Sequence, residues 1–205
     1  MLIKHRGFAP EIDPTAFIAP TAVLAGRVVA QKDCRIMYGA VLDSEGSSIK
    51  IGECAIICEN AVLRATAAGD REYTISVGNN VFIGPHATLL GCTIHSYSFI
   101  ATGATVLHGA VVHSGAAIAV GAFVHAGTIV PAGLLVPPNT IAMGDPVKIF
   151  SPSEKEALAD AIRSLGFPRI AFGTGAARDR SDLMKQVTET RSKEFGGHFD
   201  DDLLQ

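Results

Sequence analysis

A six-residue period in the aliphatic residues constrains this 205-residue chain more than any other feature of its sequence. The period runs over about 120 residues, and a small or aliphatic residue follows most of its members four positions later. Neither an α-helix, which repeats every 3.6 residues, nor a simple alternating strand produces this spacing. It predicts short strands joined by turns, with one aliphatic side chain per repeat pointing inward, as in the run Ile94, Ile100, Val106, Val112, Ile118, Val124 and Val130.

Three such repeats close a triangular coil, and successive coils stack in parallel at the inter-strand spacing of roughly 4.8 Å. Glycine at Gly52, Gly78 and Gly84 suits tight corners of this coil. The period is interrupted by extra residues around Ser44–Ser48 and by a longer excursion over residues 66–73, and one residue is missing between Leu89 and Ile94. Because repeat proteins gather insertions on one binding face, the 66–73 excursion is where we look first for a site.

The repeat pattern ends after residue 148, which divides the chain into a coil over residues 1–149 and a helical extension over residues 150–205. Ser151 and Glu154 form the pattern of a capping box, and an amphipathic helix is expected over 154–165, ending at Gly166. We expect this helix to pack back along the coil. A second helix over 181–195 is expected to reach a neighbouring chain, and the acidic tail over 198–205 to be loose.

Charge and composition exclude several classes of protein. The formal net charge of −3 offers no basic patch for nucleic acid or for an acidic membrane surface. No apolar run is long enough to span a bilayer, and the first residues lack the apolar core of a signal peptide. The four cysteines are interpreted as small thiols buried in a protein of the reducing cytoplasm. Charged residues make up only 18% of the chain, which suggests that part of its surface is buried against copies of itself.

Three segments carry a resemblance to a known family. Residues 76–94 (SVGNNVFIGPHATLLGCTI), 101–111 (ATGATVLHGAV) and 137–148 (PPNTIAMGDPVK) resemble the γ-class carbonic-anhydrase-like family of hexapeptide-repeat proteins, and the resemblance covers roughly residues 8–165. It implies a mainly β fold, the left-handed parallel β-helix, with a C-terminal α-helix. It also implies a homotrimer in which three histidines bind zinc between two subunits.

The three histidine positions of the family hold other residues in this chain. Mapped by register, they fall on Arg64, Pro85 and Leu90, whose side chains offer no donor for zinc. We therefore expect no metal at this site and no resident cofactor. Arg64 would be costly to bury alone, so an acid such as Asp43, or an anionic ligand, is expected beside it. Arg64, Glu45 and Asn60 are the candidate residues for binding a small anion or metabolite.

The remaining histidines offer weaker candidates. His86 lies one position beyond an expected ligand and is the candidate catalytic residue, although a one-residue shift points a side chain to the other face of a strand. His95 and His113 are 18 residues apart, one coil, and should stack roughly 5 Å apart. A relocated metal site that uses one or more of His86, His95 and His113 is the least favoured reading. His125 falls in the column that contains Leu90 and Leu107.

Two functions remain after these observations. The first is a homotrimeric scaffold, or binder of a small anion, that lacks carbonic anhydrase activity. The alternative is an acyltransferase that uses a CoA thioester, with His86 or His108 as its base. The complete lack of tryptophan counts against the alternative, because many acetyltransferases of this class carry a tryptophan-containing coil. Whether the chain is an enzyme at all stays open, because sites and not folds decide activity.

Overall fold

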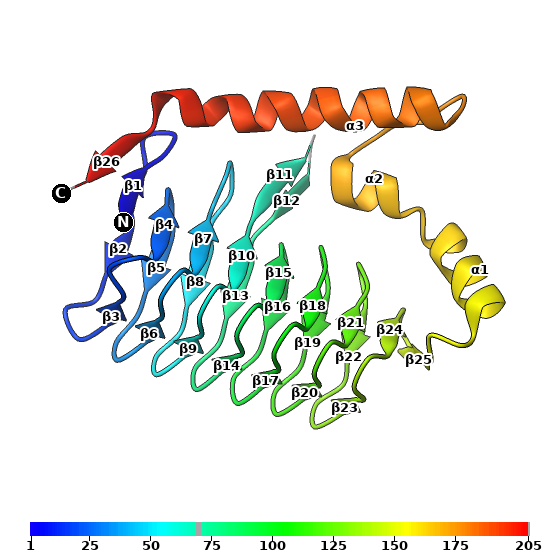
Figure 1. Ribbon diagram of the computed structural model, residues 1–205, viewed down its shortest axis with the longest axis horizontal. Coiled ribbons are helices and arrows are strands. Elements are labelled where there is room, and N and C mark those ends of the chain that lie inside the picture. The colour runs from blue at the N-terminus through cyan, green and yellow to red at the C-terminus, as the bar shows by residue number, and fades with distance from the viewer. Residues whose placement is uncertain (69–70, 205) are drawn as a thin grey trace.

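The chain winds into a triangular coil whose three faces are parallel β-sheets, seen in Figure 1 as a row of stacked turns. This is a computed structural model, and it describes residues 1–68 and 71–204. The expected left-handed parallel β-helix is confirmed. The second face consists of β2 (Glu11–Ile12), β5 (Val28–Ala30), β8 (Ile49–Ile51), β13 (Ile75–Val77), β16 (Thr93–Ile94), β19 (Val111–Val112) and β22 (Ile129–Val130).

The other two faces complete each coil. The third face consists of β3 (Phe17–Ile18), β6 (Arg35–Ile36), β9 (Ile56–Ile57), β14 (Phe82–Ile83), β17 (Phe99–Ile100), β20 (Ala117–Ile118) and β23 (Leu135–Val136). The first face carries the parallel strands β1 (Leu2–Lys4), β4 (Val23–Ala25), β7 (Val41–Asp43), β10 (Val62–Arg64), β15 (Thr88–Leu90), β18 (Thr105–Val106), β21 (Phe123–Val124) and β24 (Ile141–Met143). Antiparallel strands β25 (Lys148–Phe150) and β26 (Asp202–Leu204) close its two ends.

The aliphatic period forms the core, as expected. In register, Leu42 pairs with Leu63, Leu63 pairs with Leu89, and all three are fully buried. Apolar burial of this kind contributes about 25 cal/mol per Å², so one column of stacked aliphatic residues per face holds the coil together. The largest fully buried side chains come from all three faces: Leu24, Ile36, Leu42, Ile49, Ile51, Ile57, Leu63, Ile75, Ile83, Leu89, Ile94 and Ile100.

Corner glycines are required by the spacing between coils. A Cβ added to Gly78 would lie 2.5 Å from the backbone nitrogen of Ser96, which belongs to the next coil. Any side chain there would push the two coils apart, so the expectation that glycine suits this corner is confirmed, with the neighbouring coil as its cause.

The two insertions are also found where the period breaks. The loop over residues 44–48 joins β7 to β8. The longer excursion forms an antiparallel hairpin of β11 (Thr66–Ala68) and β12 (Arg71–Tyr73), and its residues 69 and 70 lie outside the described residues.

The C-terminal extension differs from the sequence-based expectation. Helix α1 (Lys155–Leu165) ends at Gly166 as expected, but it has no buried residue and does not run along the coil. The long helix α3 (Arg180–Phe195) does so instead, returning over the first face from the last coils to the first (Figure 1). A short helix, α2 (Phe167–Phe172), was not foreseen. No helix among the described residues has the length and apolarity needed to cross a bilayer.

The acidic tail expected to be loose has defined partners. After α3, the 3₁₀ helix η1 (Gly196–Asp200) turns the chain, and β26 pairs antiparallel with β1, Ile3 opposite Leu203. The two ends of the chain therefore lie side by side, as Figure 1 shows. The period could not predict this arrangement, because the tail contains no repeat and its partner is almost 200 residues away.

Candidate functional site

A row of outward-facing side chains on the first face positions the candidate site. Asp43, Arg64 and Leu90 are the last residues of β7, β10 and β15, and they are direct register partners. They point outward because the preceding residue of each strand is buried in the core. Arg64 and Leu90 thus lie side by side, whereas Pro85 follows β14 at the edge of the third face.

Arg64 is held by two carboxylates and an aromatic ring. Its Nη2 donates to Glu45 Oε1 and lies 3.4 Å from Asp43 Oδ2. The guanidinium carbon is 4.4 Å from the centroid of the Phe195 ring, at the end of α3. The expectation that an acid lies beside Arg64, with Asp43 as a partner, is confirmed, and Glu45 is the closer of the two.

The loop after β7 places Glu45. Its backbone adopts a left-handed conformation with φ of 45°, and its N–H donates to Asp43 Oδ1 over 3.0 Å. The Glu45 side chain is completely buried, and its Oε2 atom has no hydrogen-bond partner within residues 1–68 and 71–204. Burial alone would raise the pKa of Glu45, but the hydrogen bond and the charge of Arg64 lower it below its usual range. The pKa of Asp43 is raised by burial and by the neighbouring Glu45 carboxylate.

Two histidines from opposite ends of the chain complete the cluster. His5 Nδ1 lies 2.6 Å from Asp201 Oδ1, and His198 Nδ1 lies 2.8 Å from Asp201 Oδ2. The two imidazole rings stack, with centroids 4.2 Å apart. On its other side, His198 Nε2 is 3.3 Å from Glu45 Oε1. We call Asp43, Glu45, Arg64, His5, His198 and Asp201 the terminal cluster.

Electrostatics bind this cluster together. Although burial opposes charge on His198, hydrogen bonds to Asp201 and Glu45 raise its pKa above the ordinary histidine value. The same contact with His198, together with one from His5, lowers the pKa of Asp201 against the effect of burial. His198 therefore carries a proton more readily than a free histidine. The carboxylates of Asp43, Glu45 and Asp201 all lie within 4 Å of its ring nitrogens.

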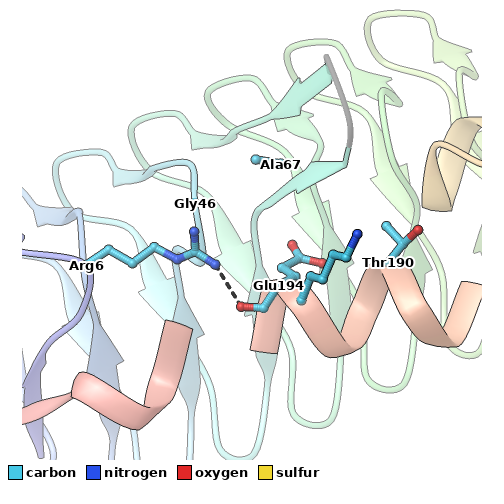
Figure 2. A pocket seen from close by; sticks show the side chains of 6 residues that line it. Arg6, Gly46, Ala67, Thr190 and Glu194 are labelled. Atoms are coloured by element: carbon cyan, nitrogen blue, oxygen red, sulfur yellow. Dashed lines mark hydrogen bonds between the residues drawn. The ribbon is translucent and has the colours of Figure 1, made fainter. Parts of the chain in front are cut away.

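A cavity of about 390 Å³ opens next to the terminal cluster, between α3, the hairpin and the 44–48 loop. Figure 2 shows Arg6 reaching across it towards α3, where its Nη2 donates to the carbonyl oxygen of Glu194 over 2.7 Å. Arg6 Nε also donates to His5 Nε2 over 3.1 Å, which connects the cavity to the terminal cluster. The cavity is lined by Arg6, Gly46, Ala67, Thr190, Lys193 and Glu194.

The structure brings the predicted site residues Arg64 and Glu45 together, with Asp43 beside them, but it places Asn60 and His86 elsewhere. His86 and Asn60 lie on exposed corners in left-handed backbone conformations, with φ of 58° and 57°. Asn60 packs against Gly39 of the preceding coil. No hydrogen bond or ion pair joins either side chain to the terminal cluster within the part of the chain that the structure describes.

The other histidines lie apart from this cluster. His95 and His113 stack with ring centroids 5.0 Å apart, which confirms their expected pairing. His108 is buried edge-on to the Tyr73 ring, and neither of its nitrogens has a hydrogen-bond partner in the described part of the chain. Burial lowers the pKa of His108 to about 4. His125 lies in the column of Leu90 and Leu107 as expected, because the preceding residues Leu89, Val106 and Val124 are register partners. Its ring contacts Phe167 of α2. Three cysteines are buried as expected, but Cys54 is exposed.

Sequence reasoning missed His5, His198 and Asp201. Each is an isolated residue in its own segment, and no local spacing relates the first ten residues to the last ten. The one available signal was the presence of a histidine within an acidic tail, because such a tail can supply carboxylates to that histidine.

Comparisons with known proteins agree with the resemblance. The chain matches no family model. It is 39% identical over 112 residues to γ carbonic anhydrase 3, mitochondrial, of Arabidopsis thaliana, covering 51% of this chain and 43% of that protein. It is 30% identical over 96 residues to γ carbonic anhydrase-like 1, mitochondrial, of the same plant, covering 45% of this chain and 38% of that protein. The chain thus spans less than half the length of these curated relatives.

Among solved structures, a hexapeptide transferase family protein from Anaplasma phagocytophilum is 22% identical, with 98% of both chains covered and a TM-score of 0.46. The repeat, the coil and the similarity to the plant proteins agree with one another. Together they show a parallel β-helix of hexapeptide repeats that is similar, over about half of its length, to γ carbonic anhydrases of Arabidopsis thaliana.

Proposed function

We propose that this chain is a homotrimeric scaffold that does not hydrate CO₂ at the three-histidine position of its relatives. The observation that carries the proposal is the neutralisation of Arg64 by Glu45 and Asp43. A catalytic zinc site needs three ligands and an open position for water, and a guanidinium already bound to two carboxylates supplies neither.

The two other mapped positions support the same reading. Leu90 lies beside Arg64 on the first face, and Pro85 lies at the edge of the third face. A hydrocarbon and a pyrrolidine ring hold no lone pair for a metal ion. The separation of Pro85 from the other two fits a site divided between two subunits, in which the neighbour's Pro85 would approach Arg64 and Leu90.

Binding of a small anion by Arg64 is the less favoured part of the original expectation. Two carboxylates already surround its guanidinium, and a further anion would have to displace one of them or enter a negative environment. We therefore assign Arg64 and Glu45 to holding α3 and the terminal segments on the coil. Asn60 and His86, at exposed corners, remain available for contacts with partners.

A trimer is supported by the apolar side chains of the third face. Phe82 and Phe99 are exposed and stack with ring centroids 5.5 Å apart. The same column of outward positions contains the exposed Phe17 and Leu135, together with Arg35, Ile56 and Ala117. Such a stripe favours burial against a second copy. We also propose the reducing cytoplasm as the compartment, because three of the four free thiols are buried.

The test is a stopped-flow CO₂ hydration assay on the zinc-supplemented protein. The wild type is expected to show no rate above buffer. The triple variant Arg64→His, Pro85→His, Leu90→His should gain zinc-dependent hydration, and Leu107→His, in the same column, is the matched control that should not. Zinc-dependent hydration by the wild type would overturn the proposal.

A second arm distinguishes a scaffold from an acyltransferase. Acetyl-CoA at about 100 times its dissociation constant would stabilise a specific binder by about 2.7 kcal/mol. The scaffold proposal predicts no change in melting temperature. A stabilisation that His86→Ala abolishes would support the acyltransferase instead. His108 is the weaker candidate base, because it is buried and a base must reach its substrate.

A further inference from the structure

Three metal-binding side chains converge at the junction of the two chain ends. His5 Nδ1 and His198 Nδ1 each face one oxygen of the Asp201 carboxylate, at 2.6 and 2.8 Å, and the three ligand atoms lie within 4.8 Å of one another. None of the three residues belongs to the positions where the relatives carry zinc ligands. Two imidazoles and one carboxylate form a ligand set that suits zinc and neighbouring first-row divalent ions.

An unpartnered buried oxygen provides an independent sign of a ligand. Glu45 Oε2 has no hydrogen-bond partner among the residues that the structure describes. It lies 4.0 Å from His5 Nε2, and both side chains are fully buried. His5 Nε2 accepts a hydrogen bond from Arg6 Nε, so the proton of the neutral ring is on Nδ1, facing Asp201. In this tautomer, His5 has no hydrogen to offer Glu45.

A metal ion on Nδ1 removes this mismatch. It forces the His5 proton onto Nε2, where it faces the orphaned Glu45 oxygen. His198 already has this arrangement, with Nδ1 towards Asp201 and Nε2 towards Glu45 Oε1. Glu45 would then contact the outer nitrogen of both rings, as carboxylates commonly do behind metal-bound histidines.

We propose that His5, His198 and Asp201 bind a divalent transition-metal ion of the zinc type, which fastens the C-terminal segment to the first coil. With bonds of about 2.1 Å, a tetrahedral ion separates its ligand atoms by roughly 3.4 Å, so the two histidine–Asp201 contacts, at 2.6 and 2.8 Å, need to open by about 0.6 to 0.8 Å. The fourth position is left to water, which can reach the site because the Asp201 side chain is 20% exposed.

The ion also requires Arg6 to release His5. Once His5 Nε2 carries a proton, it has no lone pair with which to accept the hydrogen bond from Arg6 Nε. A guanidinium close to the site also repels a cation. Arg6 is exposed and already contacts the Glu194 carbonyl oxygen across the cavity of Figure 2, so it has an alternative partner. Replacement of Arg6 by alanine should therefore strengthen metal binding. If Arg6 only held the fold together, its replacement would not strengthen binding.

The experiment is a titration of the purified, chelator-treated chain with Co²⁺, followed by visible absorption, and with Zn²⁺ in competition. We expect one ion per chain and a rise in melting temperature. His198→Gln and Asp201→Asn should abolish the tight site, Glu45→Gln should weaken it about 10- to 100-fold, and Arg6→Ala should tighten it. His113→Ala, which removes one of the other stacked histidines, is the matched control and should leave the affinity unchanged.

Melting curves in chelator first establish that each variant is folded. The proposal is overturned if the folded wild type takes up no stoichiometric metal. It is equally overturned if His198→Gln and Asp201→Asn bind as tightly as the wild type, or if His113→Ala removes the binding. This test is separate from the CO₂ assay, because it measures metal binding directly. Three protein ligands and a water also describe a catalytic zinc site, so the CO₂ assay is repeated with His198→Gln. Hydration that this variant abolishes would come from the terminal site and not from the positions of Arg64, Pro85 and Leu90.

Discussion

The guanidinium of Arg64 binds the buried carboxylate of Glu45, and this ion pair joins β10 to the loop that follows β7. Phe195 of α3 covers the same guanidinium. Through these contacts one residue connects the coil, its inserted loop and the returning helix.

Replacement of Arg64 should therefore destabilise the whole chain. Arg64→Ala leaves the Glu45 charge buried without its partner, and we expect a loss of roughly 2–4 kcal/mol in the free energy of unfolding, reduced by the partial exposure of Arg64. Urea denaturation measures this loss. Arg163→Ala, which breaks an exposed pair with Asp160, is the control and should change stability by less than about 1 kcal/mol. Equal effects of the two variants would contradict the role given to Arg64.

The terminal cluster should make stability depend on pH above neutrality. Because the folded chain raises the pKa of His198, its stabilising effect is fully present below the unfolded value of about 6.5 and is lost as pH rises through the folded pKa. In chelator, the wild type should lose stability relative to His198→Gln as pH rises above about 6.5 and through the folded pKa. Parallel stability curves for the two proteins would show that His198 contributes nothing of this kind.

Asp201 predicts the opposite dependence in acid. Its pKa is lowered in the folded chain, so its contribution is present above the unfolded value of about 3.9 and disappears as pH falls through the folded pKa. Asp201→Asn should flatten the acid side of the wild-type stability curve, measured by denaturant unfolding at several pH values. An unchanged acid limb would contradict the contacts of Asp201 with the two histidines.

His108 should be a liability to stability. Both ring nitrogens are buried without hydrogen-bond partners, and burial lowers the pKa of the ring to about 4. His108→Leu introduces an apolar side chain of similar size in place of an unsatisfied polar group. We therefore expect a gain of roughly 1–3 kcal/mol in the free energy of unfolding at neutral pH. Thermal unfolding measures the change. A marked loss of stability would instead indicate that His108 has a polar partner in solution.

The exposed apolar side chains of the third face, Phe82 and Phe99 among them, should be required for assembly of the trimer. Phe82→Asp places a charge in the stack with Phe99 and should convert a trimer into 21.4 kDa chains, as measured by light scattering after gel filtration. Phe199→Asp is the control, because Phe199 is 93% exposed on the terminal segment and away from the third face. A wild-type monomer, or a trimer that survives Phe82→Asp, would contradict this interface.

The sequence predicts the coil well and the terminal cluster poorly, for one physical reason. The coil is built from neighbours in sequence, so the spacing of residues such as Leu63 and Leu89 reports directly on contacts one turn apart. Register likewise places His95 on His113, and the cost of burying Arg64 alone predicts an acid beside it. These are local consequences of a period.

The packing of the extension follows from another kind of contact. Nothing in the period relates His5 to His198, and the stronger amphipathic pattern of α1 favours it over α3 as the packing helix. In the structure, α3 instead packs through particular contacts, such as Phe195 on Arg64 and Arg191 on the carbonyl oxygen of Ala171. Contacts between distant, non-repeating segments leave little trace in a single sequence.

An anomalous-scattering map of crystals grown with Zn²⁺ tests the account most directly, because it locates the ion rather than only detecting it. We predict one peak per chain between His5, His198 and Asp201, and no peak beside Arg64 and Leu90. A peak at Arg64 and Leu90, completed by a neighbouring subunit, would contradict both the scaffold proposal and the assignment of the terminal site.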